Sequence, residues 1–143
     1  MKVEVYEALN EDYNLSNYEN AVNNHNWKDI EKNFSWSETG KINMAYECID
    51  RHVDNGKGDK FALHYKDQNR QDSYTFKDLQ IASNKAANLL KDKANVEKGD
   101  RVFIFMPRTP ELYFALLGTL KIGGIVGPLF EAYMEKAVKD RLE

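Results

Sequence analysis

Cysteine is almost absent from this sequence of 143 residues, and Cys48 is the only one. No intramolecular disulfide can form, and no metal cluster can be built from cysteines. Cys48 lies in a helical pattern, so we expect a buried, unreactive thiol there rather than a nucleophile. The three histidines stand far apart and show none of the spacings typical of a metal site.

Long hydrophobic runs and an excess of basic residues are missing as well. The longest apolar stretch, 112–129, is interrupted by Lys121 and by glycines, so it falls short of the roughly 20 apolar residues that cross a membrane. The first residues include early acids and lack the apolar centre of a signal peptide. With 20 basic against 23 acidic residues, the sequence shows no nucleic-acid footprint. We therefore expect a cytoplasmic protein with no membrane or nucleic-acid partner.

Motifs of phosphate and nucleophile chemistry are also missing. The glycine clusters at 56–58 and 123–124 match neither the phosphate-loop pattern nor the dinucleotide pattern, and helix-ending turns explain both. No serine stands in the G-x-S-x-G context of a nucleophile elbow, and the carboxylates are scattered. The residues by themselves indicate no catalytic site and no metal site.

The composition of the sequence changes near residue 40. Residues 1–40 are rich in asparagine and acids and have too few aliphatic residues for a core of their own. We expect this stretch to be a wrapping arm with short helices around 17–24 and 27–33. Its spaced aromatic residues could anchor it on another surface. They are Tyr6, Tyr13, Tyr18, Trp27, Phe34 and Trp36.

Regular secondary-structure signals begin at residue 41. Asn43 can cap a helix that runs to about Val53, and the Asn-Gly-Lys-Gly segment at 55–58 stops it. The β-like runs 61–65 and 72–76 flank a polar segment and predict a hairpin. A capping-box pattern then opens the clearest helix in the chain. Its cap residues are Thr75 and Asp78, and its predicted inner face is Leu79, Ala82, Ala86 and Leu89.

The last third of the chain predicts a βαβ unit. The apolar run 101–106 is typical of a parallel strand, and Thr109-Pro-Glu111 has the signals of a helix start. An apolar, buried helix should follow to Gly123, and 125–129 should be the next strand. Such a unit places the chain in the α/β class. An amphipathic segment at 134–143 shows no stop signal, which suggests a boundary that folding did not set.

Several segments, in this order, resemble the adenylate-forming ligases and, among them, the acetyl-CoA synthetases. The segment 43–52 is similar to N-x-x-x-x-x-[LI]-D-R-H, and 98–107 is similar to K-G-D-R-V-x-[IL]-x-M-P. The other matching positions are Tyr74–Leu79, Asn84, Ala87, Leu90, Pro110, Glu111 and Lys121–Ile125. The resemblance implies an incomplete N-terminal portion of the ligases' α/β large domain, with 1–40 as the N-terminal helical arm and 41–143 as the start of the AMP-binding domain.

This resemblance also implies a reaction. Adenylate-forming CoA ligases join a carboxylate to AMP from ATP, release pyrophosphate, and pass the acyl group to CoA. The full-length protein should therefore use acetate, ATP, Mg²⁺ and CoA, with no cofactor held by this piece. The family's phosphate loop, its aromatic-T-E motif, its ribose aspartate and its C-terminal lysine do not occur in residues 1–143. We expect an inactive fragment; the alternative is a stand-alone binding or interaction module of the same superfamily.

One segment of the sequence falls where these ligases have a loop near CoA. It contains Phe130, Glu131 and Ala132. Many acetyl-CoA synthetases have a Gly-Gly pair where Glu131 and Ala132 stand. The resemblance implies a CoA-proximal loop in which this chain departs from the common pattern.

Overall fold

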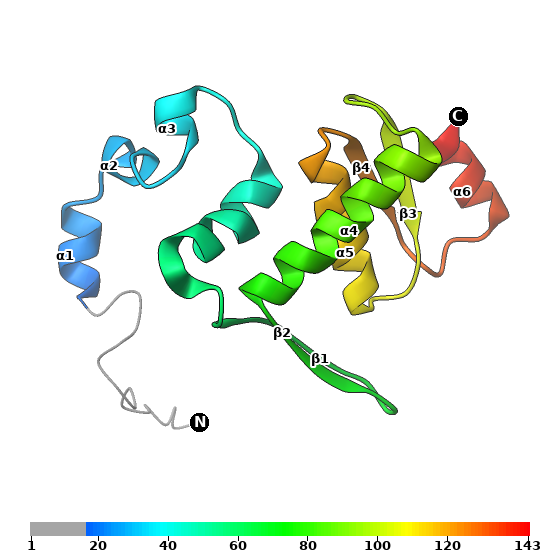
Figure 1. The fold of residues 1–143 in the computed structure, drawn as a ribbon, viewed down its shortest axis with the longest axis horizontal. Helices are drawn as coiled ribbons and strands as arrows, with labels where there is room; N and C mark the ends of the chain where they lie inside the picture. The colour runs from blue at the N-terminus through cyan, green and yellow to red at the C-terminus, as the bar shows by residue number, and fades with distance from the viewer. Residues whose placement is uncertain (1–16) are drawn as a thin grey trace, which may run out of the picture. The chain divides into compact units, whose positions relative to one another are not determined.

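The computed structural model describes residues 17–143, which divide into two compact units between Gly40 and Lys41 (Figure 1). The first unit has three short helices: α1 (Tyr18–Asn23), α2 (Trp27–Glu31) and α3 (Trp36–Thr39). The first two were predicted, although α2 ends earlier than expected, and α3 was not. Tyr6 and Tyr13 lie outside the described residues.

Asparagine side chains begin the helices of this first unit, because their oxygens satisfy free N–H groups. Asn17 Oδ1 accepts a hydrogen bond from the Asn20 N–H at 2.9 Å, and Asn26 Oδ1 accepts one from the Lys28 N–H. None of the three helices has a buried residue, and Trp27 is 70% exposed. The unit therefore has little core of its own, while the anchoring role of its aromatic residues stays a prediction.

The second unit begins with a helical segment that contains two π-helical stretches, η1 (Tyr46–Asp50) and η2 (Val53–Lys57). Asn43 Oδ1 accepts hydrogen bonds from the N–H groups of Ala45 and Tyr46, which confirms the predicted cap. The segment runs past Val53 to Lys57, across a break at Gly56, where φ is 75°.

The prediction of a buried Cys48 was wrong, since its thiol is exposed. Ala45 and Ile49 form the buried face of this segment. Cys48 directly precedes Ile49, and neighbouring residues of a helix do not share a face. Position 48 therefore falls on the solvent side.

The predicted hairpin is confirmed. Strands β1 (Phe61–Lys66) and β2 (Gln71–Thr75) pair antiparallel, with an irregularity between Phe61 and Leu63. In the turn, Asp67 Oδ1 accepts hydrogen bonds from the N–H groups of Asn69 and Arg70. Strand β2 ends one residue before the predicted limit, because Phe76 is already the first residue of the next helix.

Helix α4 (Phe76–Ala94) begins with the predicted capping box, in which Thr75 and Asp78 bond each other's backbone N–H. Its inner face was predicted in part only. The buried residues are Leu79, Ser83 and Ala87, whereas Leu89 is 61% exposed. Ser83 tolerates burial because its hydroxyl donates to the Leu79 carbonyl at 2.7 Å. The buried stripe thus follows an i, i+4 spacing that includes a polar residue.

The βαβ unit is confirmed. Strands β3 (Arg101–Phe105) and β4 (Ile125–Leu129) are parallel, and α5 (Pro110–Lys121) connects them. The core of the second unit is formed by buried side chains from the segment with η1 and η2, from α4 and from α5, and half-buried residues pack around them. The buried core residues are Ala45, Ile49, Leu79 and Leu117. Helix α6 (Glu135–Leu142) lies on the other side of the strand pair from α4 and α5 (Figure 1). Among residues 17–143, no helix is long and apolar enough to span a bilayer.

The close approach of α4 and α5 gives a test of this core. A Cβ added at Gly118 would lie 2.8 Å from the Ala86 Cβ and 2.8 Å from the Ala87 backbone nitrogen. Overpacking of this kind costs about 1–3 kcal/mol. Gly118→Ala should lower the free energy of unfolding by that amount in urea titrations.

Gly58→Ala is the matched control, because its new Cβ would meet only ordinary contacts, 3.6 Å from Val53 Cγ1 and 3.8 Å from Lys77 Cβ. It should stay within about 0.5 kcal/mol of the unchanged chain. Equal stability of the two variants would show that α4 and α5 do not pack as closely as described.

Candidate functional site

The carboxyl ends of β3 and β4 lie side by side because the two strands are parallel. Ligands of open α/β sheets bind outside the carboxyl ends of the strands. Residues 106–109 lead from β3 into α5, and residues 130–134 lead from β4 toward α6. A hollow of about 330 Å³ lies between them. Its lining residues are Met106, Arg108, Leu112, Tyr113, Pro128, Leu129, Phe130 and Glu131.

Two of the three residues predicted near CoA line this hollow. Phe130 and Glu131 contribute to its wall, while Ala132 is exposed beside them. The Phe130 ring meets the Tyr133 ring edge to face, with 5.7 Å between centroids, and the Arg141 guanidinium lies 4.2 Å from the Tyr133 centroid. Helix α6 therefore supports the loop from behind. Phe130 itself is half exposed.

The start of α5 also lies near the carboxyl end of β3, because residues 106–109 connect the two. Hydrogen bonds from its own backbone N–H and from the Thr109 side chain, followed by the Arg70 guanidinium, lower the pKa of Glu111. A carboxylate at a helix N-terminus satisfies free N–H groups and faces the positive end of the dipole. The chain's own carboxylate thus occupies the place where a ligand anion could bind.

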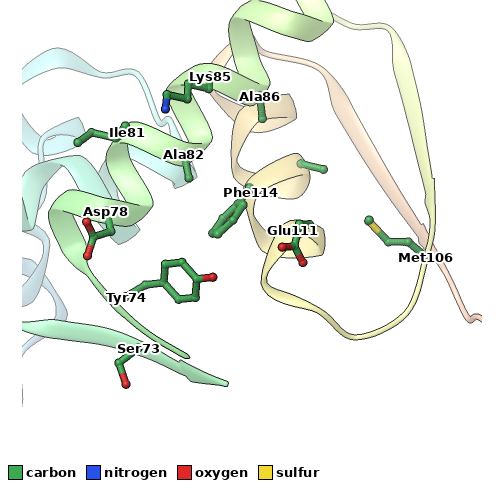
Figure 2. Close-up of a pocket in the computed structure, with 11 residues that line it drawn as sticks. Ser73, Tyr74, Asp78, Ile81, Ala82, Lys85, Ala86, Met106, Glu111 and Phe114 are labelled. Atoms are coloured by element: carbon green, nitrogen blue, oxygen red, sulfur yellow. The ribbon is translucent and has the colours of Figure 1, made fainter. Parts of the chain in front are cut away.

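A larger groove, of about 820 Å³, lies between the hairpin, α4 and α5 (Figure 2). Tyr74 and Phe114 meet in its centre with their rings 5.4 Å apart, edge to face. Met106 lines both this groove and the hollow at the strand ends. The other lining residues are Ser73, Asp78, Ile81, Ala82, Lys85, Ala86, Glu111 and Ala115.

Arg70 connects the hairpin to the start of α5 beside this groove. Its Nη1 donates to Glu111 Oε1 at 3.0 Å, its Nη2 donates to the Tyr74 hydroxyl at 2.9 Å, and it also pairs with Asp72. These groups bind and orient one another, and no histidine or cysteine lies among the groove's lining residues. The groove can hold an apolar group, but its side chains are not arranged as nucleophile and base.

Residues from the motifs of the resemblance meet at the other end of α5. Lys121 Nζ donates to Asp50 Oδ1 at 2.8 Å and to Asn84 Oδ1 at 2.6 Å. Asn43 Nδ2 donates to the Leu120 carbonyl at 3.3 Å. The lysine ammonium also faces the negative end of the helix dipole. These side chains hold three helical segments together. Their role was missed, because partners 37 to 78 residues apart leave no spacing signal.

Histidine, cysteine and acidic residues form no group of three or more that could hold a metal ion within residues 17–143. Burial, followed by the charge of Arg51, lowers the pKa of His52, whose ring packs on Phe76 at 4.7 Å. His52 is therefore a packed side chain.

Comparison with known proteins shows which family this chain belongs to. The family model of the AMP-binding enzyme matches residues 49–143. This chain belongs to the AMP-binding enzyme family. The match covers the βαβ unit, the hairpin and the groove, so these elements are the start of an adenylate-forming ligase domain.

Relatives of this AMP-binding chain are acetyl-CoA and acyl-CoA synthetases. It is 57% identical over all its 143 residues to an acetyl-coenzyme A synthetase of Bacillus subtilis, and 38% identical over 109 residues to one of Helicobacter acinonychis. The crystal structure of a Brucella canis acyl-CoA synthetase matches with a TM-score of 0.75 and 33% identity over 87% of this chain. The chain spans only 25%, 16% and 22% of these three proteins, respectively.

The lowered pKa of Glu111, caused first by its own backbone N–H, then by the Thr109 side chain and then by Arg70, predicts a pH dependence of stability. A carboxylate whose folded pKa is lowered stabilises the fold above its unfolded pKa, near 4.5, and loses that contribution as the pH falls through the folded value. Both partners are well exposed, so solvent screening keeps the gain small. Glu111→Gln should lower the urea midpoint at pH 7, and the difference should shrink below pH 4.5 and be smaller at about pH 3.

Glu97→Gln makes the same chemical change at an exposed carboxylate for which no side-chain ion pair or hydrogen bond is found within residues 17–143. Its urea midpoint should follow that of the unchanged chain at both pH values. If Glu111→Gln behaves in the same way, Arg70 does not stabilise the fold through Glu111.

Proposed function

We propose that this chain is the N-terminal part of an AMP-forming acetate–CoA ligase. The observation that carries the proposal is the 57% identity over the whole chain to the acetyl-coenzyme A synthetase of Bacillus subtilis, of which it spans 25%. In the proposed reaction, acetate attacks the α-phosphate of ATP, acetyl-AMP forms and pyrophosphate leaves. The CoA thiol then takes the acetyl group and releases AMP.

In this proposal the chain supplies a binding wall rather than the reacting groups. Phe130, Glu131 and Ala132 follow β4 at the ligand-binding edge of the strand pair, where one face of Phe130 can contact CoA. Glu131 and Ala132 replace the smaller glycines of many acetyl-CoA synthetases, so the carboxylate would border the CoA path. We assign the phosphate contacts of ATP to later parts of the protein.

Mg²⁺ accompanies ATP in the proposed reaction and would neutralise its phosphates. Because the described residues form no three-ligand cluster, we assign its ligands to the part of the protein outside this chain. A cytoplasmic location goes with the proposed substrates ATP, acetate and CoA. We propose no contact with nucleic acid or membrane.

A stand-alone interaction module is the second candidate function. The exposed aromatic rings of Phe103 and Phe105, on the strand face turned away from α5, favour it. Translation of the gene beyond codon 143 distinguishes the two candidates. A continuing frame with a phosphate loop supports the ligase; a stop codon with no related sequence in any frame supports the module.

Activity measurements test the proposal directly. The 143-residue chain should show no acetate-dependent exchange of pyrophosphate into ATP, because none of the family's phosphate-binding motifs occurs in it. The longer protein, in which its natural continuation follows residue 143, should catalyse this exchange with acetate as the best or near-best acid. Exchange by the short chain above a heat-inactivated control would contradict the proposal. Exchange only with long-chain or aromatic acids would reject acetate.

The wall assigned to CoA can be tested in the same longer protein. Phe130→Ala removes an aromatic contact worth about 1.4 kcal/mol, so KM for CoA should rise about tenfold. KM for ATP should change by less than about twofold. Phe61→Ala is the matched control, since Phe61 is a similarly exposed ring on β1. The assignment is wrong if both variants leave KM for CoA unchanged.

A further inference from the structure

Asn55 and Gly56 form an exposed turn near the end of the helical segment that contains η1 and η2. Both residues leave the helical backbone conformation: Asn55 has φ −83° and ψ 15°, and Gly56 has a positive φ of 75°. Both are exposed, and a Cβ added at Gly56 would meet no atom within 4 Å. The peptide group between them therefore borders open space, where it can rotate without a clash.

Asn55 is also the only asparagine of the chain that precedes a glycine. The side-chain amide of an asparagine can react with the backbone nitrogen of the next residue, because this attack closes a small, stable ring. A side chain on that next residue hinders the approach. Glycine has none and adopts the widest range of backbone angles. Sequence and exposure thus favour the reaction at the same position.

Two other exposed asparagines in turns differ in the nitrogen that would have to attack. Asn69 precedes Arg70, whose N–H donates to Asp67 Oδ1 at 2.7 Å. Asn95 precedes Val96, whose N–H donates to the Leu90 carbonyl at 3.0 Å. Each of these nitrogens is held by an acceptor and followed by a bulky side chain. Both asparagines therefore serve as references within the same chain.

We propose that the Asn55–Gly56 peptide is a site of spontaneous deamidation. The Gly56 nitrogen loses its proton to solvent and bonds to Asn55 Cγ, and the Cγ–Nδ2 bond breaks as ammonia leaves. Water then opens the resulting succinimide at either carbonyl, which gives aspartate or isoaspartate at position 55. The modification needs only water, and it lies outside the proposed ligase reaction.

The turn leads directly to two backbone acceptors that complete the start of α4. The Lys60 carbonyl accepts from the Phe76 N–H, and the Gly58 carbonyl accepts from the Lys77 N–H, both at 3.0 Å. These N–H groups lie in the first turn of α4 and have no acceptor within the helix. Isoaspartate at position 55 adds one atom to the backbone just before these carbonyls. It should shift them and weaken the start of α4.

Peptide mapping by mass spectrometry, during incubation of the 143-residue chain at mildly alkaline pH, tests the proposal. Asn55 should deamidate several-fold faster than Asn69 and Asn95, and its rate should rise with pH because the deprotonated nitrogen attacks. Since the turn opens at little free-energy cost, denaturing urea should accelerate the reaction at Asn55 by less than about tenfold. The product should contain isoaspartate, which an isoaspartate methyltransferase labels.

Two results of this experiment would overturn the site. One is a rate at Asn55 in the folded chain no higher than those at Asn69 and Asn95. The other is a product with aspartate but no isoaspartate, because direct hydrolysis by water would then replace attack by Gly56. Asn55→Gln is the control, since glutamine closes a larger ring far more slowly, and its amide should survive the incubation.

Urea titration of the aged chain tests the structural consequence. The isoaspartate form should unfold at a lower urea concentration than the fresh chain, while Asn55→Gln should keep its midpoint through the same incubation. Asn55→Asp carries the new charge without the longer backbone and should fall between the two. An unchanged midpoint of the isoaspartate form would show that the turn does not position the carbonyls of Gly58 and Lys60.

Discussion

Gly118 allows α4 and α5 to pack backbone against backbone, and the second unit is organised around that contact. Its missing side chain leaves room for Ala86 and for the backbone of Ala87. Since α4 also follows directly on the hairpin, and α5 connects β3 to β4, the contact joins the antiparallel and the parallel parts of this unit. A larger side chain there would separate them, because cores at native density absorb little added volume.

Polar contacts then fix α5 at both ends. At its start, Glu111 accepts from Arg70 of the hairpin turn; at its end, Lys121 reaches Asp50 and Asn84. The two contacts differ in burial. The side chains of Lys121 and Asp50 are mostly buried, whereas those of Arg70 and Glu111 are more than a third exposed. Removing one buried partner leaves an uncompensated charge, so the Lys121 end is the more costly to disturb.

The starts of the helices were predicted correctly, because a helix start is determined by a few neighbouring residues. The cap at Asn43, the capping box at Thr75 and the proline start of α5 are all found where the sequence pattern placed them. The errors at Cys48 and Leu89 share a cause, because burial depends on which neighbour a helix face meets. The predicted face of α4 was chosen from apolar residues, so it missed Ser83, which is buried with its hydroxyl bonded to the Leu79 carbonyl. At Cys48, a helical pattern alone did not show which face of the segment would be buried.

The candidate site was predicted less completely than the fold, for a physical reason. Phe130, Glu131 and Ala132 were singled out only because the family resemblance implies a loop near CoA at their positions. The partners that support them, Arg141 through Tyr133 and Met106 from the other strand, come from separate elements. Binding walls are built from such convergent surfaces, whereas phosphate-binding loops are contiguous and leave motifs. The family resemblance of this chain is therefore carried in part by structural residues such as Asp50, Asn84 and Lys121, whose side chains hold helices together.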